Sequence, residues 1–438
     1  MPHQPAMKIL LSAFACRPNA GSEPGNGWNW ATYLAARGLE VHVLTAERYR
    51  EQIEPTLAAN PIHNLGFSYV HVPQVLKRGS EAIHYIFWQR YALTVAKKLL
   101  RQTPFVLAHH VTYGSVHVPS QLWRLGIPLI FGPVGGGQTA PPAMLKYFDD
   151  HKRKEQIRTA CTHALRLSPL HRRWLRQMSI VFVANRDTLR VVQGQGCKRA
   201  ILMSDAGLPE SFFAPEPRRF QESNCPIRLL WVGRMLPRKA LPLALDALAR
   251  VRRPVSLTIV GDGLDPSYVK QMIDERKLVD RVTWQGRRLP WNEVRTSYLE
   301  HDALLFTSLR DTFACQLLEA MATGLPVITL DLHGAHDYVP EDAGLKVPVS
   351  TPDETVQNIA NAIETYAGLP VQERNDMSHA AWRFAQDFEW SARAKVMEGM
   401  YRAVLANTVD FRNVAPCFTN ARVSRTQPEE CPILSGRS

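Results

Sequence analysis

Short apolar runs alternate with longer segments of helical periodicity along most of the chain. In the first half, runs typical of buried strands occupy residues 8–14, 41–46, 67–72, 105–110, 128–134 and 180–185. A helix is predicted over 26–37, where Gly38 ends the pattern. Strands that alternate with helices in this way are typical of βα units around a parallel sheet.

The same rhythm begins again after a polar, proline-rich stretch at 208–226. Further strand-like runs cover 227–233, 255–261, 282–286, 303–308 and 326–330. Helices are predicted over 239–251 and 266–277, and another follows residue 308. The pattern therefore predicts a second doubly wound parallel sheet, and the stretch between the two sheets is interpreted as a linker.

The length of 438 residues exceeds what one hydrophobic core usually serves, which also favours two domains. We predict an N-terminal domain over 1–207, a linker over 208–226 and a C-terminal domain over 227–388. Residues 389–406 are predicted to form a helix, and a return of that helix to the N-terminal domain is an open alternative. Helical periodicity is lost from Asn407, so 407–438 is predicted to be a disordered tail.

The net charge of +12 favours anionic partners: nucleic acid, acidic lipid or phosphorylated small molecules. Residues 84–102 and 151–177 mix Lys and Arg with Trp, Phe and Leu at roughly helical spacing. Such segments suit contact with an anionic membrane surface, and for residues 84–102 a solvated basic face is an equal alternative. No nucleic-acid recognition motif accompanies the charge, so no nucleic-acid partner is predicted.

Cysteine usage and hydropathy point to a reducing compartment without a membrane span. The seven cysteines form no C-x-x-C pair, which argues against a structural zinc site and against a disulfide framework. No apolar stretch reaches the roughly 18 residues of a spanning helix. We expect a cytoplasmic protein, and peripheral contact with the inner face of the membrane is left open.

A basic loop follows the first strand of the second sheet. Gly233 ends the strand, Arg234 comes next, and Lys239 stands at the expected start of a helix. Two cations at a strand end can converge on one anionic group, to which a helix N-terminus adds unpaired N–H donors. The alternative is an ordinary solvated basic loop. The spacing of a P-loop is absent.

A second strand-to-helix junction carries two carboxylates, Asp311 and Glu319. The loop and helix start between them offer backbone N–H groups to an anion, from Thr312, Phe313, Ala314 and Cys315. The two carboxylates can accept hydrogen bonds from hydroxyl groups of a sugar or a ribose. A plain helix cap is the alternative explanation for Asp311.

Two features of the first half are further candidates. Gly25, Asn26 and Gly27 lie between the first strand and its helix, where glycines let the backbone approach a phosphate or a sugar. His109 and His110 end the strand at 105–110, and either one is a candidate to contact the sugar in a cleft. Ordinary loop and core roles are equally acceptable for these residues.

In this order and spacing, the segments VGRMLPRKAL, LTIVGDG, VTWQGR and ALLFTSLRDTFACQLLEAMATGLPVITL resemble a known enzyme family. They are similar to the C-terminal half of retaining glycosyltransferases of family four, also called glycosyl transferases group 1. SAFACRPNAGSEPGNGWNWA resembles the family's N-terminal Gly-rich loop. The resemblance covers about residues 7–405 and implies the GT-B fold, with two Rossmann-like domains that face each other across a cleft.

The resemblance also implies residue roles. Arg234 and Lys239 match the family's basic pair for the diphosphate of a nucleotide sugar such as a UDP- or GDP-hexose. Glu319 matches the second acid of the E-x7-E signature, which holds the ribose, and Asp311 stands at the first acid, which contacts the donor sugar. In the family, the leaving phosphate takes the acceptor's proton.

Two departures from the family pattern bear on activity. Asp311 is one methylene shorter than the usual Glu, and Ala314 stands where Gly is common. We interpret them as a change of donor sugar. The expected function is retaining transfer of a hexose to a glycan, on a lipid-linked acceptor, without a metal or cofactor. A catalytically silent, donor-binding partner subunit is the alternative. An NAD-dependent enzyme is disfavoured because neither first strand is followed by a full G-x-G-x-x-G.

Overall fold

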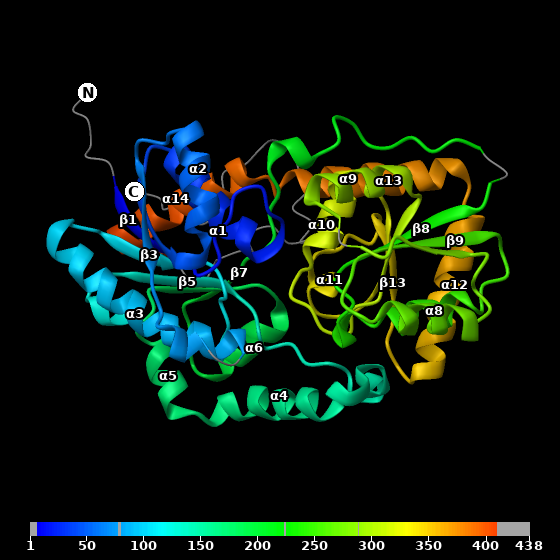
Figure 1. Ribbon diagram of the computed structural model, residues 1–438, viewed down its shortest axis with the longest axis horizontal. Helices are drawn as coiled ribbons and strands as arrows, with labels where there is room; N and C mark the ends of the chain where they lie inside the picture. Colours follow the sequence, from blue (N-terminus) through cyan, green and yellow to red (C-terminus); the bar gives the residue numbers. More distant parts are fainter. Residues whose placement is uncertain (1–6, 78–79, 223–224, 288, 410–438) are drawn as a thin grey trace. The chain divides into compact units, whose positions relative to one another are not determined.

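The computed structural model describes residues 7–77, 80–222, 225–287 and 289–409 (Figure 1). The chain divides into two compact units. Unit 1 contains Met1–Gly137, Thr162–Gly207 and Trp390–Ser438, and unit 2 contains Gln138–Cys161 and Leu208–Glu389. Of the predicted tail at 407–438, residues 410–438 lie outside the described residues.

Unit 1 is built on a seven-stranded parallel sheet in the order β3-β2-β1-β4-β5-β6-β7. Its strands are β1 (Lys8–Ser12), β2 (Glu40–Ala46), β3 (Leu65–Val70), β4 (Leu107–His110), β5 (Leu129–Val134), β6 (Ile180–Val183) and β7 (Ala200–Leu202). Its main helices are α1 (Ser22–Ala36), α2 (Arg50–Ala59), α3 (Glu81–Gln102), α5 (Pro169–Leu175), α6 (Arg186–Gly194) and α14 (Trp390–Ala406). The predicted strands of the first half are confirmed, and β7 is an addition.

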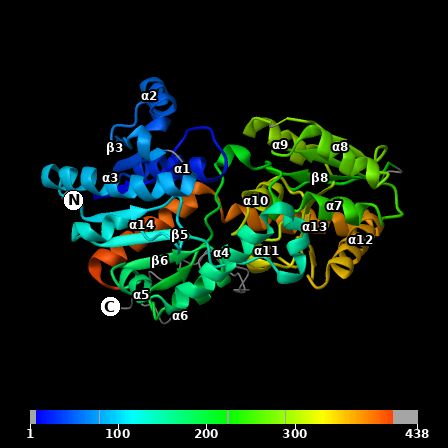
Figure 2. The same ribbon diagram turned by 60° about the horizontal axis from the view of Figure 1, so that its bottom comes forward.

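Unit 2 is built on a six-stranded parallel sheet in the order β10-β9-β8-β11-β12-β13. Its strands are β8 (Ile227–Val232), β9 (Val255–Val260), β10 (Val282–Trp284), β11 (Ala303–Phe306), β12 (Val327–Leu330) and β13 (Gly344–Val347). Its helices are α7 (Leu241–Leu248), α8 (Pro266–Glu275), α9 (Trp291–Glu300), α10 (Cys315–Ala322), α11 (His333–Tyr338), α12 (Pro352–Gly368) and α13 (Val371–Gln386). Helices cover both faces of each sheet (Figure 2).

Two segments pack in the unit that is formed mainly by the other half of the chain. Helix α14 belongs to unit 1, whereas Gln138–Cys161 belongs to unit 2 although the sequence pattern placed it in the N-terminal domain. This second segment contains the 3-10 turns of Pro142–His151 and most of α4 (Lys152–Ala164). Met144 and Phe148 enter the hydrophobic core of unit 2, and Tyr147 donates a hydrogen bond to Asp246 Oδ2 at 3.0 Å. Apolar side chains on an irregular turn gave no periodic signal.

The segment that the sequence analysis interpreted as a linker packs along unit 2. Phe212 and Phe220 are buried. The indole of Trp382 on α13 donates to the Ala214 carbonyl at 2.8 Å, and the Phe220 N–H donates to Asn375 Oδ1 at 2.7 Å. The described part of 208–226 is therefore fixed to one domain by buried aromatic rings and hydrogen bonds.

Helix α1 begins at Ser22, four residues before the predicted start, so Gly25, Asn26 and Gly27 are helical. A β-carbon at Gly25 would lie 1.8 Å from the Ala20 carbonyl oxygen, and one at Gly27 would lie 2.0 Å from that of Ala15. The Asn26 side chain donates to the Asp205 carbonyl at 2.8 Å. These three residues therefore seat the helix on neighbouring backbone. Their predicted contact with a donor stays a prediction.

His109 and His110 are both fully buried in the interior of unit 1. His109 Nε2 donates to the Gly132 carbonyl at 2.7 Å, and its Nδ1 is hydrogen-bonded to the Tyr401 hydroxyl of α14 at 2.6 Å. His110 is bonded to Ser12 Oγ at 2.9 Å and to the Tyr85 hydroxyl at 2.8 Å. Each ring nitrogen has a protein partner. This corrects the expectation that one of the two histidines faces a cleft.

The close approach of α1 gives a test on two helical glycines. Gly25→Ala should lower the free energy of unfolding by more than about 2 kcal/mol, because its methyl group meets backbone that cannot move aside. Gly194→Ala is the matched control: a β-carbon at Gly194, the last residue of α6, has no atom within 4 Å. This variant should be neutral or more stable by about 0.5–1 kcal/mol. Urea unfolding measures both, and an unchanged stability of the Gly25 variant would contradict the packing.

The buried histidines predict a pH dependence of stability. Burial lowers the pKa of His109 to about 4 and that of His110 to about 3, with the neighbouring His109 contributing to the second shift. The unfolded chain binds more protons below the ordinary pKa of about 6.5, so stability should fall as the pH drops from there towards 4. Each histidine contributes a slope of about 1.4 kcal/mol per pH unit.

Urea unfolding between neutral pH and about pH 4.5 measures this slope. His110→Asn should make it shallower by about 1.4 kcal/mol per pH unit. Tyr85→Phe removes the hydroxyl and its hydrogen bonds to His110 and Gln89 but keeps both imidazoles, so it should lower stability without changing the slope. Burial raises the pKa of Glu23 to about 7, which opposes the histidines equally in all three proteins. An unchanged slope in the His110 variant would contradict the account.

Candidate functional site

The candidate site of unit 2 lies where strands β8 and β11 end side by side. The strand order reverses at this point: β8 has β9 and β10 on one side, whereas β11, β12 and β13 follow on its other side. In doubly wound sheets, ligands bind outside the carboxyl ends of the strands at such a reversal. Gly233 and Arg234 follow β8, and the loop at 307–314 follows β11.

Hydrogen bonds join these two loops directly. The Thr307 hydroxyl lies 3.1 Å from the carbonyl oxygens of both Lys239 and Ala240, and the Leu309 N–H donates to the Arg238 carbonyl at 2.8 Å. Ala240 has a left-handed φ of 48°, so a short turn at Pro237–Lys239 precedes α7, which begins at Leu241. The predicted helix start at 239 was therefore two residues early.

Asp311 binds two basic side chains of the neighbouring loop. Its Oδ2 lies 2.6 Å from Lys239 Nζ and 2.9 Å from Arg238 Nη1. Burial alone would raise the pKa of the Asp311 carboxyl, but Lys239 and Arg238 outweigh it and hold the pKa well below its usual range. Asp311 is therefore an ionised carboxylate that forms ion pairs within the protein. These ion pairs were not predicted from the sequence, where a contact with the donor sugar was expected.

Lys239 is a buried cation with few partners. It is 6 % exposed, its Nζ lies 3.4 Å from Gln316 Oε1, and the same atom lies 4.8 Å from the centre of the Phe306 ring. Burial lowers its pKa, and the charge of Asp311 works in the opposite direction. Asp311 thus favours the protonated form of Lys239, the form that can bind an anion.

Arg234 differs from its neighbours in the basic loop. Its side chain is exposed, and among the described residues it has no hydrogen-bond or ion-pair partner. Gly233 and Gly261 both have a φ of 151°, and a β-carbon at Gly261 would lie 1.9 Å from the Gly233 carbonyl oxygen. The strand ends of β8 and β9 therefore pack backbone to backbone, and this leaves Arg234 at the surface of the loop.

The loop between Asp311 and α10 is held from behind. A β-carbon at Gly334 would lie 1.7 Å from the Thr312 carbonyl oxygen, so α11 approaches this loop closely. Phe313 is buried against the rings of Tyr338 and Phe388, and Ala314 is the buried residue before the first turn of α10. Cys315 begins the helix. Ala314 is the N-cap residue of α10, and its methyl side chain makes no capping hydrogen bond.

Glu319 lies in the middle of α10 with both carboxylate oxygens occupied. Trp291 Nε1 and the Tyr298 hydroxyl, both on α9, donate to it at 2.8 Å each. Burial raises the pKa of Glu319, and these two donors partly offset the shift. Each carboxylate oxygen retains a second acceptor site, so hydroxyl groups of a ligand can still bind. The aromatic pair was missed because residues 28 and 21 positions apart give no local signal.

Sequence reasoning also missed Arg238 and Glu155. Arg238 belongs to the same basic loop as Lys239, and its charge was the available signal. Glu155 lies on α4, and its Oε1 is 2.7 Å from Arg310 Nε. This ion pair connects the crossing segment at 138–161 to the residue beside Asp311, and a charge separated by 155 positions could not be assigned from the sequence.

Unit 1 has its own reversal of strand order, between β1 and β4. Glu23, on the first turn of α1, accepts a hydrogen bond from the Tyr113 N–H at 2.9 Å. Burial raises the pKa of this carboxyl to about 7, an effect that the hydrogen bond partly offsets and that the charge of Asp205 increases. Tyr113 has a left-handed φ of 54°, so the backbone after β4 is shaped at this point.

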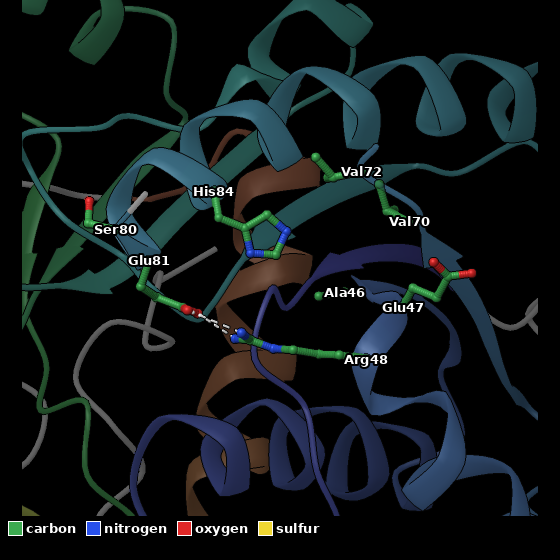
Figure 3. Close-up of a pocket in the computed structure, with 8 residues that line it drawn as sticks. All are labelled: Ala46, Glu47, Arg48, Val70, Val72, Ser80, Glu81 and His84. Atoms are coloured by element: carbon green, nitrogen blue, oxygen red, sulfur yellow. Dashed lines mark hydrogen bonds and ion pairs between the residues drawn. The ribbon is translucent and has the colours of Figure 1, made fainter. Parts of the chain in front are cut away.

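A pocket of about 250 Å³ lies in unit 1 near the carboxyl ends of β2 and β3. Figure 3 shows the Arg48 guanidinium pointing at the Glu81 carboxylate, with the His84 imidazole beside the pair. Arg48 Nη1 lies 3.1 Å from Glu81 Oε2, and Arg48 also packs over the rings of Phe14 and Tyr49. The pKa of Glu81 is lowered, mainly by the hydrogen bonds that Arg48 donates to it. The other lining residues are Ala46, Glu47, Val70, Val72 and Ser80.

Two kinds of feature are absent from the described residues. No group of three or more His, Cys, Asp or Glu residues there is placed to hold a metal ion. In the same residues, no helix combines the length and the apolar character that crossing a membrane requires.

The sequence of unit 2 is similar to known glycosyltransferases. Residues 226–365 match the family model of glycosyl transferases group 1. Glycogen synthase of Mycobacterium tuberculosis (strain H37Rv) is 26% identical over 181 residues, which are 41% of this chain and 43% of that protein. Lipopolysaccharide 1,6-galactosyltransferase of Salmonella typhimurium is 33% identical over 147 residues, which are 33% of this chain and 39% of that protein. The chain thus spans about two fifths of the length of these curated relatives.

Solved structures match nearly the whole chain. Sucrose-phosphate synthase from Thermosynechococcus elongatus has a TM-score of 0.65 at 18% identity, covering 92% of this chain and 100% of that one. HepE from Anabaena, in complex with UDP and glucose, has a TM-score of 0.58 at 16% identity, covering 91% of this chain and 100% of that one. At these identities the likeness shows the fold. The chain therefore has the GT-B fold of glycosyltransferases, and its residues 226–365 are similar to glycosyl transferases group 1.

Proposed function

We propose that the protein is a retaining glycosyltransferase that moves a hexose from a nucleoside-diphosphate sugar to a glycan acceptor. The observation that carries the proposal is the position of the basic loop. Arg234, Arg238 and Lys239 follow β8 at the reversal of strand order, inside the segment that matches glycosyl transferases group 1. A nucleoside diphosphate is the ligand whose charge this loop suits best.

The basic loop would act on the leaving group. As the sugar–phosphate bond breaks, negative charge develops on the diphosphate, and cations placed beside it lower the barrier. Arg234 is exposed, and the charge of Asp311 favours the protonated form of Lys239, so both are suited to this task. The N–H groups of Thr312 to Cys315 would bind the phosphates. Glu319, with its remaining acceptor sites, would bind the ribose hydroxyls.

We assign the acceptor to unit 1 and, more specifically, a sugar of the acceptor to the pocket of Figure 3. Its ion pair of Arg48 and Glu81 supplies hydrogen-bond donors and acceptors, and Val70 and Val72 supply apolar surface. Such a mixture suits the hydroxyl groups and apolar faces of a saccharide. We propose a lipid-linked acceptor in polysaccharide or cell-surface glycan biosynthesis. The similarity to a lipopolysaccharide galactosyltransferase supports this choice.

Metal ions, cofactors and the location of the reaction are the remaining features of the proposed function. We propose that transfer needs neither a metal ion nor a cofactor, because two basic side chains replace the charge of a cation at the diphosphate. The protein would act in the cytoplasm at the inner face of a membrane. Activity that persists in EDTA, and a product with the anomeric configuration of the donor, would support the metal-independent, retaining reaction.

One observation favours a second candidate. The carboxylate of Asp311 is engaged by Arg238 and Lys239, so it is not free to bind a donor sugar in this arrangement. A protein that binds the nucleotide without transferring the sugar would then serve as a catalytically silent partner subunit of a glycan-assembly complex. Slow hydrolysis of a bound donor in the absence of acceptor separates the enzyme from this alternative.

Calorimetric titration with UDP, GDP and ADP and their hexoses tests the donor site. One nucleotide should bind, and Arg234→Ala should weaken it by about 10- to 100-fold, the effect of losing one charge-assisted hydrogen bond. Glu319→Ala should weaken it similarly. Lys270→Ala, an exposed cation on α8, is the control and should leave the affinity unchanged. Binding by none of the nucleotides would overturn the proposed function, and binding without any turnover would favour the silent subunit.

Asp311 should control the protonation of Lys239. In Asp311→Asn the buried ammonium loses its counter-charge, its pKa falls further, and nucleotide affinity should decrease more steeply than in wild type as the pH rises from about 6.5 to about 8.5. Asp311→Glu keeps the carboxylate and should retain the wild-type profile. Calorimetry at several pH values measures this dependence. Identical profiles for the Asn variant and the wild type would show that Asp311 does not act through Lys239.

A further inference from the structure

We propose that one surface of unit 1, formed by α5 and the turn before it, binds an anionic lipid surface. The α5 patch consists of Arg166, Leu167, Leu170, Arg172, Arg173 and Arg176, all of which are exposed. Binding of this patch to lipid is independent of the proposed transfer reaction and is measured without it.

The two leucines of the patch are unusually exposed for apolar residues. Leu167 is 86 % and Leu170 is 63 % exposed. The half-buried Trp174 borders Leu170 on the same side of the helix, since the two are four residues apart. Leucine pairs with an adjacent tryptophan are the side chains that insert at the boundary between lipid headgroups and acyl chains.

The orientation of α5 is fixed from inside. His171 and Leu175, four residues apart, are buried, and His171 Nε2 donates to the Val116 carbonyl at 2.6 Å. The Ser168 hydroxyl caps the helix by accepting from the His171 N–H at 3.2 Å. Arg173 and Arg176 therefore lie on the opposite, outward face. Figures 1 and 2 show α5 on the outside of unit 1, close to α6.

The charge of the patch has a single sign. No acidic residue occurs between Glu155 and Asp187, a stretch that includes the whole patch. Among the described residues, none of the four arginine side chains of the patch has a hydrogen-bond or ion-pair partner. Arginines that have no partner within the protein complement a surface of phosphate groups.

The combination of charge and exposed leucines favours lipid over nucleic acid. Phosphates of a nucleic acid would use the arginines alone and leave Leu167 and Leu170 in water. A membrane uses both: its headgroups bind the arginines, while its interface takes up the leucines and the edge of Trp174.

Sedimentation of the full chain with phospholipid vesicles tests the proposal. Wild type should bind phosphatidylcholine vesicles that contain about one third phosphatidylglycerol, and should not bind pure phosphatidylcholine. Each basic residue near an anionic surface strengthens binding about fivefold, so Arg172→Glu with Arg173→Glu should weaken it by at least about 30-fold. Leu167→Ser with Leu170→Ser should weaken it by at least about tenfold without a change in net charge.

Arg124→Glu with Lys395→Glu, two exposed cations of unit 1 that lie outside residues 84–102 and 151–177, is the control for net charge and should change binding less than about threefold. An equal loss in this control would overturn the assignment to α5, and so would a wild-type protein that ignores anionic vesicles. Binding of duplex RNA that both arginine substitutions abolish, with vesicle binding unchanged, would overturn it in favour of nucleic acid. Circular dichroism confirms that each variant is folded.

Discussion

The ion pairs between Asp311 and the two basic side chains of the neighbouring loop are the contacts on which the candidate donor site depends. They join the loops after β8 and β11, which hydrogen bonds between Thr307, Leu309 and the backbone of 238–240 already hold together. Asp311 binds Arg238 and Lys239 but not Arg234, so the loop keeps an excess of positive charge. Burial lowers the pKa of Lys239 and the charge of Asp311 opposes that shift, while the side chain of Arg234 is exposed.

The two buried histidines of unit 1, in contrast to Arg234, have all their hydrogen-bond partners inside the protein. His109 and His110 are held by Gly132, Tyr401, Ser12 and Tyr85, so every ring nitrogen is satisfied within the protein. Such a network fixes the end of β4 and the seat of α14, and it leaves no titratable histidine at the surface there. The two buried histidines of unit 1 therefore serve packing, whereas the basic loop of unit 2 keeps the exposed arginine Arg234.

The sequence predicted the two sheets well because buried parallel strands are continuous apolar runs. It missed Ala200–Leu202 and Gly344–Val347. It also predicted that the loops after β8 and β11 form the site, because ligand-binding residues of such sheets follow the strands, and this stays a prediction. It could not predict the partners: Tyr401 reaches His109 from 292 positions away, and Glu319 is held by an adjacent helix. Tertiary packing decides such contacts, and a strand-end histidine looks the same whether buried or exposed.

The central claim is that a nucleoside diphosphate binds where β8 and β11 end. Hydrogen–deuterium exchange of the full chain, with and without the nucleotide that binds, locates the ligand directly. The account predicts slower exchange of backbone amides in 233–240 and 311–319, with little change in the pocket segments at 46–48 and 80–84. Slower exchange confined to those pocket segments, or unchanged exchange in 233–240 and 311–319 at saturating nucleotide, would contradict the account.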